Sequence, residues 1–143
     1  MRPARPSAVA LLAALLATLL AILAGCATPG EFACSAGQQV SISDLLYFGT
    51  NKPGGVVSAE QWSQFLRETV TPRFPAGLTS WQASGQWQAA DGTLTHEDSY
   101  VLNLVHSADP KTETAIRSIM SEYKTRFRQE AVLRVSSPAC ASF

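Results

Sequence analysis

The chain has 143 residues, with 11 basic and 11 acidic side chains and a formal net charge of zero. Setting aside Arg2 and Arg5, which lie in the N-terminal segment discussed next, leaves nine basic against eleven acidic side chains. This balance argues against nucleic acid as a partner, because proteins that bind it usually present a basic face. Without that N-terminal segment, residues 26–143 have a length that fits one domain with a single core.

The N-terminus has the pattern of a bacterial lipoprotein signal. Arg2 and Arg5 precede an uncharged run over 7–23, and the sequence Leu-Ala-Gly-Cys then ends at Cys26. We expect 1–25 to be a signal peptide and Cys26 to be lipidated. The alternative is an uncleaved membrane anchor, since the run reaches the roughly 17 residues of the shortest spans, but an anchor has no need of the Gly-Cys pair.

The same pattern predicts the location of the protein. We expect an exported domain held in the cell envelope by its N-terminal lipid, with 26–40 as a linker and 41–143 as the folded domain. Ala27 follows the cysteine where an aspartate would resemble an inner-membrane retention signal. The outer membrane, with the domain facing the periplasm, is therefore favoured in a Gram-negative bacterium.

The first part of the domain predicts a strand and a helix. Apolar and aromatic residues dominate 42–48, and a loop rich in glycine and proline follows, as expected for a strand and its turn. Ser58 and Gln61 have the spacing of a capping box, and apolar residues recur behind them at helical spacing. Pro72 and Pro75 end the predicted helix.

A hairpin is predicted next. Residues 78–88 alternate, with Trp81 and Trp87 on one face and polar side chains on the other, which indicates a half-buried strand. Asp91 and the glycine after it mark a turn into a second strand over about 95–105.

A second helix and a last strand complete the pattern. Asp109 followed by Pro110 is typical of a helix start, and 127–136 is expected to be a strand. The order strand, helix, strand, strand, helix, strand is the ferredoxin-like split βαββαβ arrangement of the α+β class. We therefore expect a four-stranded antiparallel sheet with two helices on one face.

Two cysteines remain once Cys26 is assigned to lipid. Cys34 lies just before the first predicted strand and Cys140 just after the last, and exported domains are readily oxidised. A disulfide between them requires the first and last strands to be antiparallel neighbours, as they are in the ferredoxin-like arrangement. The alternative is two unpaired cysteines.

The sheet face not covered by helices is the simplest place for a binding site. If the more apolar set of each strand faces the helices, then Glu97, Ser99, Asn103, Glu130 and Arg134 lie on the open face. These residues could bind a polar ligand or transfer protons. They could equally form ordinary cross-strand pairs on a wet surface.

Two further candidates come from single residues. Arg73 lies between Pro72 and Pro75, a stiff segment that could hold its guanidinium toward an anion or toward a loop carbonyl. His96 and His106 sit at opposite ends of one predicted strand without cysteine partners, so we expect no metal site. The sequence has no glycine-rich phosphate loop or other cofactor motif, and no cofactor is predicted.

Six segments spread over most of the domain carry a family resemblance: 46–49 (LYFG), 70–79 (VTPRFPAGLT), 85–87 (GQW), 97–99 (EDS), 129–134 (QEAVLR) and 138–140 (PAC). By these segments the chain resembles a family of bacterial envelope lipoproteins known as a domain of unknown function, family 3574. It implies relatives and no particular chemistry.

The sequence therefore favours a lipid-anchored envelope domain that works by binding through its open sheet face. The partner would be a second copy, giving a homodimer, or another envelope protein. One alternative is a small cofactorless or haem-handling enzyme of the paired ferredoxin-like barrel type, with Arg73, Glu97 and Ser99 as the residues to suspect. Another is a purely structural lipoprotein.

Overall fold

The computed structural model describes residues 32–142 except residue 89. The predicted signal peptide and Cys26 lie outside the described residues. Ala33–Phe143 forms a single compact unit. Its elements in chain order are β1 (Gln39–Gly49), β2 (Asn51–Lys52), β3 (Gly55–Val56), α2 (Ala59–Phe65), the π-helical segment η1 (Leu66–Val70), β4 (Thr79–Gln88), β5 (Leu94–His106), α3 (Pro110–Phe127) and β6 (Leu133–Ala141).

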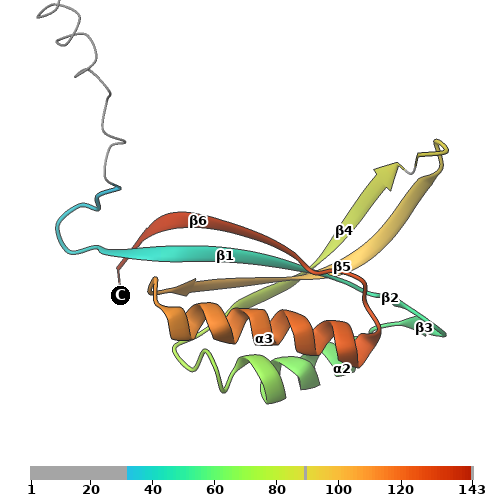
Figure 1. Cartoon of the computed structure of the whole chain (residues 1–143), viewed down its shortest axis with the longest axis horizontal. Coiled ribbons are helices and arrows are strands. Elements are labelled where there is room, and N and C mark those ends of the chain that lie inside the picture. The colour runs from blue at the N-terminus through green and yellow to red at the C-terminus, as the bar shows by residue number, and fades with distance from the viewer. Residues whose placement is uncertain (1–31, 89, 143) are drawn as a thin grey trace, which may run out of the picture. The chain divides into compact units, whose positions relative to one another are not determined.

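The main sheet has four antiparallel strands in the order β4-β5-β1-β6. Figure 1 shows α2 and α3 together on one side of this sheet, with its other side uncovered. With β2 and β3 set aside as a small separate hairpin, this is the ferredoxin-like arrangement predicted from the element order. That prediction is confirmed.

Local signals explain where the helices begin and end. The Ser58 side chain accepts from the Gln61 amide and the Gln61 side chain accepts from the Ser58 amide, so the predicted capping box is present. Asp109 caps α3 by accepting from the amides of Lys111 and Thr112. Both predicted helix starts are confirmed.

The core lies between the helices and the sheet and is rich in aromatic side chains. Phe48 packs against Trp62, Phe65 and Tyr123, with ring centroids 4.6 to 6.1 Å apart. Trp62 also stacks on Tyr100 of β5 at 4.8 Å. These side chains are nearly or fully buried, and edge and stacked contacts of this kind add to the hydrophobic term.

The last strand differs from its prediction. Phe127 is the final buried residue of α3, and β6 begins only at Leu133 and runs on to Ala141. Leu133 pairs with Tyr47, and Val135 pairs with Leu45. These apolar residues therefore lie on the open face, and the intervening Arg134 lies on the helix side.

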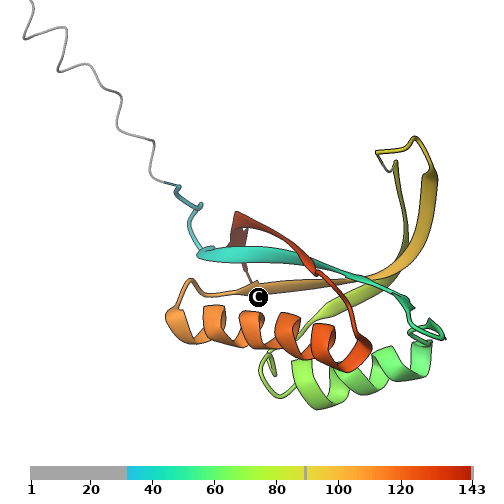
Figure 2. The same cartoon turned by 45° about the vertical axis from the view of Figure 1, so that its right-hand side comes forward.

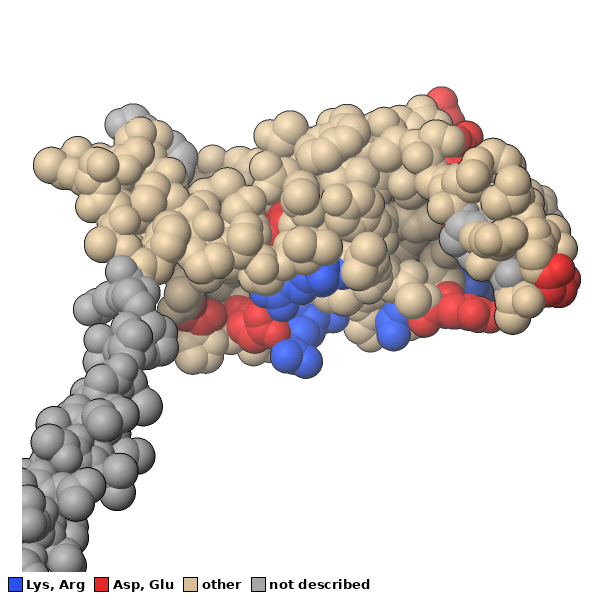
Figure 3. Space-filling view, turned by 90° about the horizontal axis from the view of Figure 1, so that it is seen from above, with Lys and Arg blue, Asp and Glu red and all other residues tan. Residues whose placement is uncertain are grey.

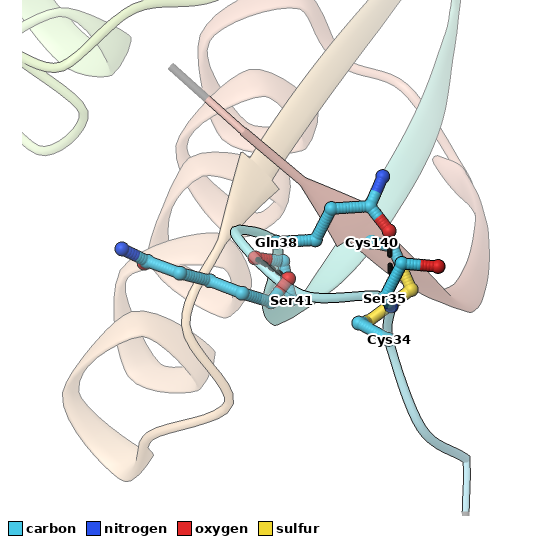
Figure 4. Close-up of a disulfide and its surroundings, with 6 residues drawn as sticks. Cys34, Ser35, Gln38, Ser41 and Cys140 are labelled. Carbon is cyan, nitrogen blue, oxygen red and sulfur yellow. Dashed lines mark hydrogen bonds between the residues drawn. A yellow bond between two sulfur atoms is a disulfide. The ribbon is translucent and has the colours of Figure 1, made fainter.

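The predicted disulfide between Cys34 and Cys140 is present, with the two Cα atoms 5.5 Å apart. Figure 4 shows it joining the segment before β1 to the end of β6. Cys140 lies within β6, opposite Val40, rather than after the strand. The bridge closes a loop over 106 positions, which in the chain-entropy model stabilises the fold by up to about 5 kcal/mol.

The β4–β5 hairpin extends beyond the rest of the sheet. Gly49, the last residue of β1, pairs with Ser99, so 94–97 of β5 pair only with 85–88 of β4. We call these two stretches the arm. Figures 1 and 2 show the arm bending away from the helices, which makes the open face concave.

Candidate functional site

The open face of the sheet is apolar and almost uncharged. Trp81, Val105, Leu133 and Val135 lie on this face by register and are 43 to 60% exposed. Val101 lies there too but is only 1% exposed, because it is flanked in register by Tyr47 on β1 and Trp81 on β4. The predicted placement of Ser99 and Asn103 on this face is confirmed.

Glu97 is the one charged residue that the register of β1, β4, β5 and β6 places on the open face. Figure 3 views the molecule from this side and shows a broad tan surface, with most of the charged side chains along the lower margin and a few acidic ones toward the right-hand end. An exposed apolar surface of this extent is typical of an interface.

A cleft of about 790 Å³ lies at the end of β1, beside the base of the arm. We call it the Glu97 cleft. Its walls come from β1, β2, β4, β5, the start of β6 and the loop after α3. The lining residues used below are Gly49, Lys52, Gly85, Glu97, Ser99, Arg128 and Glu130. Its volume lies within the range of small-molecule sites.

Two glycines flank Glu97 and Ser99 on the open face. Gly49 pairs with Ser99, and Gly85 pairs with Glu97. A Cβ on Gly49 would lie 2.7 Å from Oε1 of Glu97, and one on Gly85 would lie 3.3 Å from the Glu97 carbonyl oxygen. Glycine within a strand weakens it and often marks the close approach of a ligand or another chain. Here the two glycines leave the floor of the Glu97 cleft free of side chains, and Gly49 leaves room for the Glu97 carboxylate.

Backbone contacts hold this floor in place. The Asn51 amide donates to Oε1 of Glu97 at 3.1 Å, and the Gln129 side-chain amide donates to the Asn51 carbonyl. The Tyr123 hydroxyl donates to the Gly49 carbonyl at 2.9 Å, and burial raises the pKa of Tyr123 well above its ordinary value. The β1 end, β5 and the loop after α3 are thus tied together around Glu97.

The charged residues of the Glu97 cleft differ in how they are engaged. Lys52 donates to the Gln61 side chain at 2.8 Å and lies 5.7 Å from the centre of the Phe127 ring. Glu97, Arg128 and Glu130, which also lines the cleft, take part in no ion pair among the described residues. Glu97 is half-buried and Arg128 is exposed.

Arg128 has an unusual backbone. It follows the last turn of α3 with φ 55° and ψ 45°, the left-handed conformation that glycine normally supplies at this position. It is the only non-glycine residue with positive φ within the described part of the chain. A side chain at such a position costs roughly 1 kcal/mol or more, and this one lines the Glu97 cleft.

The prediction that Arg134 and Glu130 lie on the open face is wrong. Arg134 points to the helix side, where its Nε and Nη2 donate to the fully buried Asp44 at 2.9 and 2.7 Å and its Nη1 donates to Glu113 at 2.7 Å. Glu130 lies in the loop before β6. The apolar set of β6 faces outward because the buried carboxylate of Asp44 needs a cationic partner.

Asp44 is the centre of a polar network under the sheet. It also pairs with His106, whose Nε2 lies 2.8 Å from Oδ2. Burial of Asp44 opposes its ionisation, but hydrogen bonds from Arg134, His106 and Ser136 outweigh burial, so the pKa of Asp44 lies below its ordinary value. This network holds β1, β5 and β6 in register and lies on the face opposite Glu97.

The other predicted site residues are separated. Arg73 donates to the Thr69 carbonyl and pairs with Glu122 of α3, in the helix layer. It does not line the Glu97 cleft, so the two residues that the enzyme alternative needs together lie apart. Asn103 sits further along the open face, where its side chain accepts from Ser43. Binding roles for Arg73, Asn103 and Arg134 stay predictions.

Two observations concern other kinds of site. Over 32–142, leaving out residue 89, no cluster of three His, Cys, Asp or Glu side chains is arranged to hold a metal ion. No helix in this part of the chain is long and apolar enough to cross a bilayer.

Comparison with known protein families assigns the chain to one of them. The model of the family "Protein of unknown function (DUF3574)" matches residues 43–143, and the chain belongs to this family. No curated protein matches the sequence. Four segments that carry the family resemblance, 46–49, 85–87, 97–99 and 129–134, contribute residues to the Glu97 cleft.

Solved structures show the same fold. A phage SAM lyase in complex with S-methyl-5'-thioadenosine is 13% identical with a TM-score of 0.52, over 81% of this chain and 97% of the lyase chain. A phage SAM lyase in the apo state gives the same identity and TM-score over 80% and 97%. At this identity the likeness concerns the fold alone.

Sequence reasoning found Glu97 and Ser99 but missed the residues that make their surroundings. An isolated glycine within an alternating strand, as at Gly85, is a signal for close approach that could have been read. Gly49 directly follows the strand predicted over 42–48, where a glycine indicates a turn rather than a close approach. Arg128 carried no signal, because nothing in the residue type indicates a left-handed backbone.

Proposed function

We propose that this protein is a lipid-anchored domain of the cell envelope that acts by binding, and that the open face of its sheet packs against the open face of a second copy. The observation that carries the proposal is the open face itself. It exposes Trp81, Val105, Leu133 and Val135, and Glu97 at one end is its only charged residue by register. Two such faces meet without burying unpaired charges across most of their area.

The area of the open face supports a second copy of the chain as its binding partner. Four strands at about 4.8 Å spacing, each about ten residues long with a rise of about 3.3 Å, give a footprint of about 600 Å². The corrugated surface of side chains and the arm add to this. A standard interface buries about 800 Å² on each partner, so face-to-face pairing supplies the area that a stable dimer needs.

The arm supports the same occupant. Residues 94–97 pair only with β4, and Leu94 in the arm is 56% exposed. A two-stranded hairpin by itself is marginally stable in water. The arm bends over the open face (Figure 2), so a second copy seated there gives the arm a surface to pack against.

The lipid anchor is part of the proposal. Cys26 and Cys34 are eight positions apart, which a fully extended chain spans in at most about 28 Å. The disulfide to Cys140 fixes the Cys34 end of β1, so that end of the domain would stay close to the membrane. In a Gram-negative bacterium the favoured location is the outer membrane, facing the periplasm.

The anchor is tested by Cys26→Ser. We expect this substitution to abolish labelling by radioactive palmitate and to move the protein from the detergent phase to the aqueous phase. Ala27→Ser serves as the control and should leave both properties unchanged. Palmitate labelling that persists in Cys26→Ser contradicts lipidation at this residue.

The open face is tested by Val135→Arg against Val56→Arg. Both valines are about half exposed, at 47 and 58%, but Val135 lies on the open face and Val56 lies in the small β2–β3 hairpin. In sedimentation of the oxidised exported domain, the wild type and Val56→Arg should be dimers and Val135→Arg a monomer. A wild-type monomer excludes self-association, and crosslinking in cells then tests another envelope protein as the occupant.

A further inference from the structure

The Glu97 cleft contains two opposite charges, on Glu97 and Arg128, that no ion pair neutralises, and the exposed Glu130 lines it as a second carboxylate. Glu97 stands on its floor and Arg128 on its wall, and neither forms an ion pair within the described ranges, with each other or with a third residue. Lys52, the other cation of the cleft, is already engaged by Gln61 and Phe127.

The positions of Glu97 and Arg128 each carry a cost in the stability of the fold. Glu97 is half-buried and is seated over Gly49, a strand glycine whose Cβ would clash with its Oε1. Arg128 occupies a left-handed backbone position that glycine would fill without strain. Strain of this kind clusters at ligand sites, where the surroundings hold it in place.

We infer that the Glu97 cleft binds a small zwitterion, with its protonated amine on Glu97 and its carboxylate or phosphate on Arg128. A carboxylate that is partly withdrawn from water gains most from a cationic hydrogen-bond donor. The guanidinium offers a forked set of donors that matches a planar or tetrahedral anion. The clear floor between Gly49 and Gly85 leaves room for the ligand to reach the backbone beside Glu97.

This inference goes beyond the proposed pairing of open faces and is tested separately from it. The probes are glycine, γ-aminobutyrate and 6-aminohexanoate, which carry both charges at increasing separation. Hexylamine and hexanoate carry one charge each and serve as controls. The exported domain is titrated and the amide resonances of Asn51 and Ser99 are followed by NMR, because both residues adjoin Glu97.

At least one amino acid should bind saturably and roughly tenfold more tightly than either single-charge control. Glu97→Gln should weaken this binding roughly tenfold or more and bring its affinity down to that of hexanoate. Arg128→Gly should bring it down to that of hexylamine while raising the melting temperature, since glycine relieves the left-handed backbone. Glu60→Gln, which removes an exposed carboxylate of α2 that does not line the cleft, should leave binding unchanged.

Gly49→Ala provides a second variant, since it displaces the Glu97 carboxylate without removing it, and it should also weaken binding. The inference is overturned if no probe binds saturably, if hexylamine or hexanoate binds as tightly as the amino acids, or if Glu97→Gln binds like the wild type. Repeating the titration on the monomeric Val135→Arg variant separates this result from the outcome for dimer formation.

Discussion

Asp44 offers the sharpest test of how the sheet is held to its helices. It is fully buried and accepts two hydrogen bonds from the Arg134 guanidinium, at 2.9 and 2.7 Å, while Nε2 of His106 lies 2.8 Å from its Oδ2. Asp44→Asn keeps the shape but removes the charge, and its amide group presents donors to the guanidinium. Breaking a buried pair costs roughly 3–5 kcal/mol, and because one carbonyl oxygen remains we expect about 3 kcal/mol.

A loss of about 3 kcal/mol is a large share of the total free energy of unfolding. A domain of this length has a free energy of unfolding on the order of 10 kcal/mol. With a urea dependence of about 1.5 kcal/mol per molar, the midpoint of urea unfolding should fall by about 2 M. A fall that corresponds to less than about 1 kcal/mol would show that Asp44 is not the buried partner that holds Arg134.

The pH dependence gives an independent check on the same residue. Because the pKa of Asp44 is lower in the folded protein than in the unfolded chain, its ionised form stabilises the fold above the unfolded value of about 4. That contribution is lost as the pH falls through the folded pKa. The difference in the free energy of unfolding between wild type and Asp44→Asn, measured by urea unfolding, should therefore be constant from about pH 5 to 7 and shrink below about pH 4. A gap that persists to pH 2 refutes the reasoning.

Three further variants test separate contacts. Replacing Cys34 and Cys140 together by alanine should lower the free energy of unfolding by about 4 kcal/mol, and a melting temperature equal to that of the oxidised wild type would contradict this. Tyr123→Phe leaves the Gly49 carbonyl without its donor and should cost about 1–2 kcal/mol in urea unfolding; no measurable cost would argue against this bond. Arg73→Ala removes the contacts to Thr69 and Glu122 and should cost about 1 kcal/mol, whereas unchanged stability would assign Arg73 no structural role.

The order of elements could be predicted because each element carries a local signal. The capping box at Ser58 and the Asp109-Pro110 start specify the helices within a few residues. The alternation of β5 is unambiguous, since Tyr100, Leu102 and Leu104 form one apolar set, so the placement of Glu97 and Ser99 on the other face was correct.

The register of β6 could not be predicted in the same way. Leu133 and Val135 form an apolar set that resembles a core face, and the preference for burying apolar side chains favours turning it inward. The orientation of β6 is decided instead by Asp44, 90 positions earlier, whose buried charge requires Arg134 on the helix side. A one-residue slip of this kind moves every side chain of the strand to the other face.

The Glu97 cleft was predictable only in part. Glu97 and Ser99 lie on β5, a strand with clear alternation. The shape of the cleft, however, depends on the pairing of Gly49 and Gly85 with these two residues. The left-handed backbone of Arg128 arises from the way α3 ends and the chain turns toward β6. Both features depend on contacts between segments far apart in sequence.

The most direct test of the proposed function is sedimentation equilibrium of the oxidised domain, residues 27–143, over about 1–100 µM. The account predicts a mass of two chains that persists at the low end of this range, as expected for face-to-face burial of the open sheets. A mass of one chain at the highest concentration would contradict self-association through the open face.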